Sequence, residues 1–162
     1  MAELTNLETK LGEVIGLAMA AQAATERVEK LTTNAQLRKQ LKTMRQEAAK
    51  AEKDGTAVAA SIDGKKGKIL AEARSVRNKG ANMMKSYLER GSDDLDGFEF
   101  LTMTEAGEVG HWSILQELNK QARHAGVRDL VKVQLPIQRR HLKDVMAASL
   151  QLAANEDANA TA

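Results

Sequence analysis

Apolar and small side chains recur at alternating spacings of three and four residues along most of this chain. That spacing places them on one face of an α-helix, whereas the side chains of a strand alternate with a period of two. Aromatic residues make up only 2% of the composition, which disfavours a β-sandwich or barrel. The pattern predicts an all-α protein built as a helical bundle. The clearest stripe comprises Leu4, Leu7, Leu11, Val14, Ala18, Ala21, Thr25 and Val28.

Turn residues divide the pattern into five helical segments. Thr32, Thr33 and Asn34 are typical turn and N-cap residues, Asp54 and Gly55 form a stop or turn signal, and Gly126 ends the fourth segment. The predicted helices cover residues 3–31, 35–53, 68–89, 94–125 and 127–154.

The long first, second, fourth and fifth segments predict one four-helix bundle domain over residues 1–154. Residues 55–91 are then a long, partly helical crossover between the second and third bundle helices. Residues 155–162 are small and polar, and they predict a flexible C-terminal tail.

The composition excludes several kinds of site. The chain has no cysteine, so it forms no disulfide, thiolate zinc site or cysteine nucleophile. It contains no phosphate loop, nucleophile–base pair or dinucleotide fingerprint. Charged residues stand where a signal peptide would have its apolar segment, and no apolar run is long enough to span a bilayer. We therefore expect a cytoplasmic protein without a membrane segment.

Polar residues interrupt the apolar stripes of the last two predicted helices. Glu108 and His111 lie three residues apart on one helix, and Gln138 and His141 do so on the next. Residues at this spacing share a helix face. With the turn centred near residue 125, the four residues lie at similar distances from it along the chain. In an antiparallel hairpin all four side chains should therefore converge at one level.

A carboxylate, two imidazoles and an amide oxygen at one level suit a metal ion. Burying such groups unpaired is costly, so they either satisfy one another or share a ligand. Iron, manganese and zinc are each compatible with these donors. Glu47, at the edge of the buried stripe of the second helix, is a further candidate. The candidate metal ligands are Glu47, Glu108, His111, Gln138 and His141.

The run from Ala106 to His111 and the later run from Gln138 to His141 resemble the second half of rubrerythrins and related di-iron proteins of the ferritin-like superfamily. In that family each half-bundle supplies a Glu from one helix and a Glu-x-x-His from the next. The resemblance implies a four-helix bundle with a di-metal centre at mid-height. It also implies a role in iron handling or in defence against oxidative stress.

The chain departs from the ligand set of that family. Gln138 stands where the last helix should supply Glu, and Lys50 stands where the second helix should supply His. The Glu of the first helix would fall near Gln22. The ligand set is therefore incomplete, ferroxidase-type oxidoreductase activity stays open, and no catalytic residue is assigned.

Two further interpretations fit the same sequence. The polar residues can form a structural hydrogen-bond network in a non-catalytic bundle that acts through oligomerisation or partner binding. We expect a homo-oligomer. Residues 64–90 carry eight Lys or Arg and two Glu, a charge that suits nucleic acid. Because no aromatic platform accompanies these charges, we favour a solvated face or a surface for an acidic partner.

Overall fold

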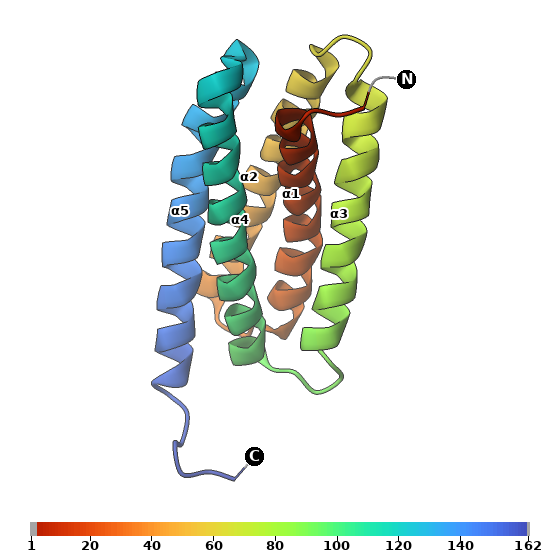
Figure 1. The fold of residues 1–162 in the computed structure, drawn as a ribbon. Helices are drawn as coiled ribbons and strands as arrows, with labels where there is room; N and C mark the ends of the chain where they lie inside the picture. Colours follow the sequence, from red (N-terminus) through yellow and green to blue (C-terminus); the bar gives the residue numbers. More distant parts are fainter. Residues whose placement is uncertain (1–2, 162) are drawn as a thin grey trace.

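Helices form the whole framework of the protein (Figure 1). The computed structural model describes residues 3–161, and over that range it contains no strand. The predicted all-α class is therefore confirmed. None of the helices in this range is long and apolar enough to cross a membrane. The five helices are α1 (Asn6–Leu31), α2 (Ala35–Ala60), α3 (Lys66–Tyr87), α4 (Asp94–Ala122) and α5 (Ala125–Ala153).

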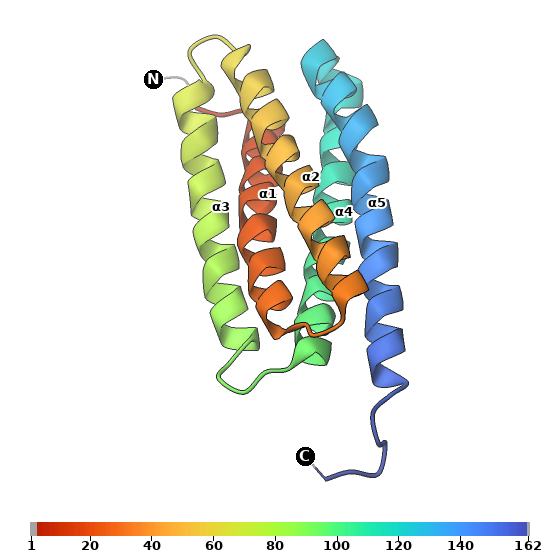
Figure 2. The same cartoon turned by 180° about the vertical axis from the view of Figure 1, so that it is seen from behind.

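Each helix runs antiparallel to the one before it (Figures 1 and 2). α1 packs against α2, α3 and α4, and α5 packs against α4 and α2. These contacts place α1, α2, α4 and α5 around a shared interior, with α3 outside it alongside α1. The predicted crossover is therefore mostly a full-length helix. Because α3 returns the chain to the end at which α2 began, α2 and α4 run parallel.

Side-chain caps fix where the helices begin. Thr5 accepts a hydrogen bond from the backbone N–H of Glu8, and the Glu8 side chain accepts one from the backbone of Thr5. Asp93 and Asp96 form the same reciprocal pair at the start of α4. Asn34 accepts from two backbone N–H groups of α2, as its position predicts. Each cap satisfies donors that the first helical turn leaves without partners.

The predicted stop at Asp54 and Gly55 is wrong. α2 continues through both residues to Ala60. A Cβ at Gly55 would lie only 2.7 Å from Cγ1 of Ile15 on α1. The glycine therefore allows α1 and α2 to approach closely, and it does not end the helix.

The predicted end of the fourth helix at Gly126 is also wrong. α4 ends at Ala122, and Gly126 lies in the first turn of α5. Arg123 caps α4 with φ of 55°, in the left-handed region. His124 then caps α5, because its Nδ1 accepts a backbone N–H from the first turn. These two residues form the turn, and the turn therefore lies earlier in the chain than predicted.

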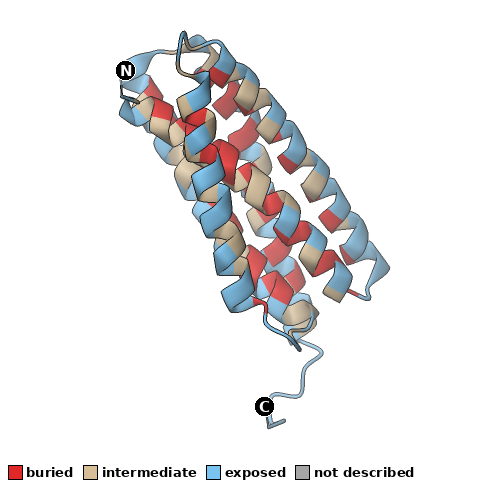
Figure 3. Cartoon of the chain, turned by 90° about the vertical axis from the view of Figure 1, so that its right-hand side faces the viewer, coloured by how far each residue is buried: buried red, intermediate tan, exposed pale blue. Residues whose placement is uncertain are grey.

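The apolar core consists of two halves. One half includes Trp112 and the other includes Phe98, and both side chains are almost completely buried. Figure 3 shows that the buried residues lie on the helix faces that look toward one another. Along α2, α4 and α5, polar residues stand between the residues of the two halves. These polar residues are Glu47, Glu105, Glu108, Gln138 and His141.

Glycines bring α3 close to α1. A Cβ at Gly12 would lie 2.8 Å from the carbonyl oxygen of Ile69, and a Cβ at Gly16 would overlap the carbonyl oxygen of Ala73. On the other side, a Cβ at Gly80 of α3 would lie 2.8 Å from a methyl group of α1. The backbones therefore pack almost directly against each other. This contact holds the outer helix, of which only Ile69 and Ala73 are buried.

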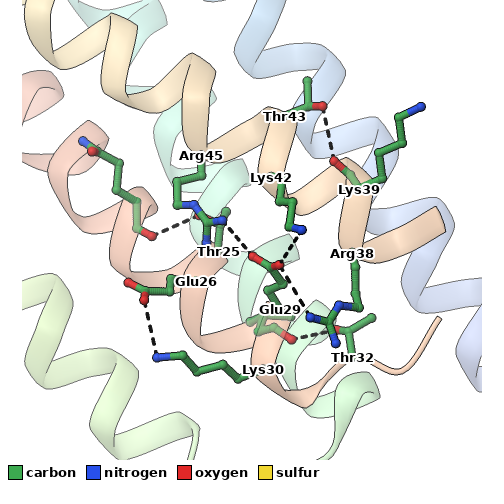
Figure 4. Close-up of polar contacts among 12 residues, drawn as sticks. Thr25, Glu26, Glu29, Lys30, Thr32, Arg38, Lys39, Lys42, Thr43 and Arg45 are labelled. Carbon is green, nitrogen blue, oxygen red and sulfur yellow. Dashed lines mark hydrogen bonds and ion pairs between the residues drawn. The ribbon is translucent and has the colours of Figure 1, made fainter. Parts of the chain in front are cut away.

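A cluster of charges joins α1 to α2 near their shared turn (Figure 4). Glu29 of α1 lies 2.8 Å from a guanidinium nitrogen of Arg45 and 3.5 Å from Nζ of Lys42. A nitrogen of Arg38 lies 3.9 Å away. The three cationic side chains are 30%, 57% and 48% exposed. Exposed ion pairs contribute about 0–1 kcal/mol each, so this cluster orients the hairpin more than it stabilises the fold.

Candidate functional site

Five polar side chains from three helices meet between the two halves of the core. We call them the mid-bundle cluster. Four of them are at most 4% exposed, and the fifth, Glu47, lies at the edge with 24% of its side chain exposed. Buried polar groups at this density require partners. The mid-bundle cluster consists of Glu47 on α2, Glu105 and Glu108 on α4, and Gln138 and His141 on α5.

Gln138 links the two carboxyl groups of α4. Its Nε2 donates a 2.6 Å hydrogen bond to Oε2 of Glu108 and a 3.2 Å hydrogen bond to Oε2 of Glu105. An amide nitrogen carries two protons, one for each of these acceptors. Gln138 therefore fixes α5 against two successive turns of α4.

His141 joins α5 to both neighbouring helices. Its Nε2 lies 2.5 Å from Oε2 of Glu47 on α2, and its Nδ1 lies 3.6 Å from Oε2 of Glu105 on α4. Arg140, whose side chain is half exposed, also pairs with Glu47. Both ring nitrogens thus face carboxylate groups, which is the environment that favours a protonated imidazole.

Burial and charge determine the protonation of the mid-bundle cluster. Burial and the neighbouring charge of Glu105 both raise the pKa of Glu108 well above its ordinary value of 4.5. Burial lowers the pKa of His141, but hydrogen bonds and charges from Glu105 and Glu47 outweigh it and raise the pKa above 6.5. Burial raises the pKa of Glu47, but its hydrogen bonds to His141 and Arg140 outweigh it and lower the pKa. Glu108 therefore tends to be neutral, and His141 tends to be cationic.

His111 does not join the mid-bundle cluster, so the predicted convergence of all four residues is wrong in this respect. Its Nδ1 lies 3.0 Å from Oε2 of Glu13 and 3.2 Å from Nζ of Lys10, both on α1. Its side chain is 39% exposed. His111 is therefore part of a separate, partly solvated ion-pair group between α4 and α1.

The position of the α4–α5 turn explains this change of partners. The turn consists of Arg123 and His124, so its centre lies one to two residues before the predicted centre at residue 125. The residue that faces Gln138 is therefore Glu108 and not His111. The same shift brings Glu105 toward His141. Glu105 was not among the predicted residues, although its place one turn before Glu108 on the same helix face was a usable signal.

The two other positions compared with the ligands of the ferritin-like family lie away from the mid-bundle cluster. Nε2 of Gln22 donates a 2.5 Å hydrogen bond to Oε2 of Glu52. Lys50 is 65% exposed and pairs with Asp54 on its own helix. Lys50 therefore brings no positive charge to the mid-bundle cluster.

A groove between α2 and α5 leads from the surface to the mid-bundle cluster. Its volume is about 460 Å³, and Glu47 and His141 form part of its wall. Arg140 and Asp144 lie along the same groove. Solvent therefore reaches this side of the cluster at the ion pair between Glu47 and His141. Glu108 lines a second, smaller groove of about 180 Å³.

Gln134 is a buried amide beside the cluster, one turn before Gln138. It is 1% exposed, and neither of its amide atoms has a hydrogen-bond partner among residues 3–161. An unpaired buried amide costs about 1–3 kcal/mol.

Gln134→Leu should therefore raise the free energy of unfolding, measured by urea denaturation, by about 1–3 kcal/mol. Gln138→Leu removes the hydrogen-bond donor of Glu108, so it should lower the free energy of unfolding. An increase in the free energy of unfolding in both variants would contradict this prediction.

Stability should fall as the pH rises above the ordinary pKa values of two buried groups, 4.5 for Glu108 and 6.5 for His141. Glu108 and His141 both have raised pKa values in the folded state. Each group makes its full contribution to the free energy of unfolding below its unfolded pKa, which is near 4.5 for Glu108 and near 6.5 for His141. That contribution is lost as the pH rises through the pKa of the group in the folded state. Glu47 behaves oppositely, since its lowered pKa gives stability that is lost as the pH falls below 4.5. The expected slope is about 1.4 kcal/mol per pH unit for each extra proton that the folded state holds.

Urea denaturation at a series of pH values measures this slope. Glu108→Gln removes one of the two protons and keeps the shape of the side chain, so it should flatten the profile. Glu117→Gln changes a carboxylate of the same helix that is 71% exposed, and it should leave the profile unchanged. A wild-type slope in the Glu108→Gln variant would show that Glu108 does not hold the proton.

The mid-bundle cluster as arranged does not fit a metal ion. His141 directs both ring nitrogens at carboxylates, and Gln138 presents its amide nitrogen to the two carboxyl groups of α4. Within residues 3–161, no group of three or more His, Asp or Glu side chains could hold a metal ion. The atoms that could act as ligands are thus hydrogen bonded or ion paired with one another, as in a closed network.

Known proteins provide no further guide to the site. Comparison of this chain with protein-family models, with curated proteins and with solved structures finds no match.

Proposed function

We propose that this chain is a ferritin-like, non-catalytic helical bundle that acts by self-association, and that the mid-bundle cluster is a structural network. The observation that carries this proposal is the mutual pairing inside the cluster. Gln138 bridges the two carboxyl groups of α4, and His141 lies between α2 and α4. A buried network of this kind is satisfied in one register of the helices only, so it selects that register over alternatives.

An apolar surface over α3 and α4 supports self-association. Met83 and Met103 are each 39% exposed, and Tyr87 is 57% exposed. The ring of Tyr87 lies 5.8 Å from that of Phe100, and Phe100 and the two methionines line one groove of about 180 Å³. Exposed apolar groups gathered in this way mark association surfaces, and methionine adapts to an apolar partner.

Sedimentation velocity tests this proposal. The wild-type chain should sediment as a dimer or larger species, and Tyr87→Lys combined with Met103→Glu should give a monomer. The control is Val133→Lys, which changes an apolar side chain of α5 that is 51% exposed, and it should keep the wild-type state. A wild-type chain that is monomeric at the highest concentration examined would overturn self-association.

Metal binding, in iron handling or in defence against oxidative stress, is the competing function. The observation that favours it is the presence of three carboxyl groups and one imidazole in a single cluster, donor types that iron, manganese and zinc accept. The long connection between α2 and α4 is also typical of ferritin-like bundles. The ligands would be Glu47, Glu105, Glu108 and His141, after the carboxyl groups turn away from their present partners.

Metal analysis of protein purified without chelator separates the two functions. If the cluster is a structural network, the wild-type chain, His141→Ala and the control His111→Ala should all contain far less than one metal ion per chain. One metal ion per chain in the wild type and in His111→Ala, with its loss in His141→Ala, would establish the metal site and overturn the structural network.

A further inference from the structure

We propose that the end of the α4–α5 hairpin is a binding site for a small oligophosphate. A hollow of about 750 Å³ lies there, and four cationic side chains line it without any Asp or Glu. This volume is in the range of small-molecule sites in proteins. The hollow is independent of the mid-bundle cluster and of the proposed self-association surface. Its lining residues are Gln116, Asn119, Lys120, Arg123, Arg128, Val131 and Lys132.

The charges around the hollow are only partly compensated. Lys120 pairs with Glu117 at 2.6 Å, and Arg128 pairs with Asp129 at 2.9 Å. Neither carboxylate lines the hollow. Four like charges around one space repel one another, and the repulsion opposes the folded arrangement. An anion that carries several charges relieves this repulsion, and a single-charged anion relieves less of it.

Two of the four cations have no acidic partner in the described part of the chain. Arg123 and Lys132 are exposed, and residues 3–161 contain no carboxylate within ion-pairing distance of either side chain. Arg123 comes from the α4–α5 turn and Lys132 from the third turn of α5. The guanidinium and the ammonium are therefore both available to a ligand, from two directions.

The backbone of the turn is held firmly, and it presents Arg123 in an uncommon conformation. The residue has φ of 55°, where glycine or asparagine is the unstrained choice. The buried Asn119 side chain fastens the turn, because it donates to the carbonyl oxygen of His124 at 3.1 Å and accepts from its N–H at 2.9 Å. The arginine side chain thus begins from a fixed point at the mouth of the hollow.

The side-chain chemistry selects phosphate over other anions of similar charge. Two guanidinium groups offer planar, paired N–H donors that match two oxygens of a phosphate, and two ammonium groups add point charges. Four cations around one hollow suit a ligand with at least two adjoining phosphate groups. The same chemistry would accept the phosphates of a nucleic-acid backbone, and the experiment below separates the two sources.

Isothermal titration calorimetry with sodium tripolyphosphate tests the site. The wild-type chain should bind the probe at about one per chain at low salt, and more weakly at higher salt because screening acts on exposed charges. Arg123→Asn combined with Lys132→Gln should weaken binding by about tenfold or more, since it removes two charge-assisted contacts. Asparagine tolerates the left-handed conformation, so the variant keeps the turn.

The matched control is Lys66→Gln combined with Lys85→Gln, which removes the same net charge from exposed positions of α3. It should change the affinity by less than about twofold, since distant exposed charges are screened. No binding by the wild type, or equal weakening in the two double variants, would overturn the proposal. A short DNA duplex is the second probe, and binding of the duplex without binding of tripolyphosphate would also overturn it.

Discussion

Replacing His141 with leucine should lower the free energy of unfolding by about 3–5 kcal/mol, as expected when one partner of a buried ion pair is removed. The imidazole is 3% exposed and lies between Glu47 and Glu105, and leucine can donate to neither. Glu47 can still pair with Arg140 and meet solvent. Glu105 is 1% exposed and would keep only the 3.2 Å hydrogen bond from Gln138.

Urea denaturation measures this loss, and His111→Leu is its matched control. His111 forms its ion pair at a side chain that is 39% exposed, so its loss should cost at most about 1 kcal/mol. Adding Glu105→Gln to His141→Leu should recover part of the stability, because the uncompensated buried carboxylate is gone. Equal losses in the two histidine variants would show that the mid-bundle cluster stabilises the fold no more than a surface pair does.

Replacing Gly16 with leucine should lower the free energy of unfolding by about 3 kcal/mol, at the upper end of the usual cost of overpacking. A Cβ there would overlap the carbonyl oxygen of Ala73 and lie 2.7 Å from Cβ of Val76. One of these obstacles is the backbone of α3, which cannot rotate away as a side chain can. We therefore expect α3 to move off α1, and hydrogen–deuterium exchange should show the loss of protection mainly in α3.

Gly107→Ala is the matched control for this substitution. Gly107 also lies inside a helix, but a Cβ there would meet nothing within 4 Å. Alanine should therefore raise the free energy of unfolding by about 0.5–1 kcal/mol, the usual difference between glycine and alanine in a helix. Unchanged exchange in α3 of the Gly16→Leu variant would show that the close approach of the two helices does not hold α3 in place.

Local features were predictable from the sequence where the chemistry is itself local. The turn before α2 and the first apolar stripe needed only neighbouring residues. The structure places Asn34 as the N-cap of α2 and buries the stripe from Leu11 to Val28, although Leu4 lies before α1 begins. Gly55 and Gly126 were misjudged, because glycine serves both turns and close helix contacts. Gly55 faces Ile15 of another helix, a contact that no local pattern contains.

The candidate site was only partly predictable. Polar interruptions in the apolar stripes correctly pointed to Glu108, Gln138 and His141 as residues that come together. His111 was wrongly predicted to join them and Glu105 was not predicted, because the α4–α5 turn was expected too late in the chain. Whether any of these residues binds a metal ion stays a prediction for the experiments above.

The sequence by itself determined that this protein is all-α and that polar residues interrupt the buried faces of its last helices. Both properties follow from the period of the helix and from residues a few positions apart. Only the tertiary structure decided which polar side chains meet. Side chains on one helix face are three or four residues apart along the chain. If a helix is displaced along its neighbour by one turn, the side chain at each contact is therefore replaced by the one three or four residues away. A small error in the turn therefore replaces Glu108 with His111 opposite Gln138, and no local pattern reveals the difference.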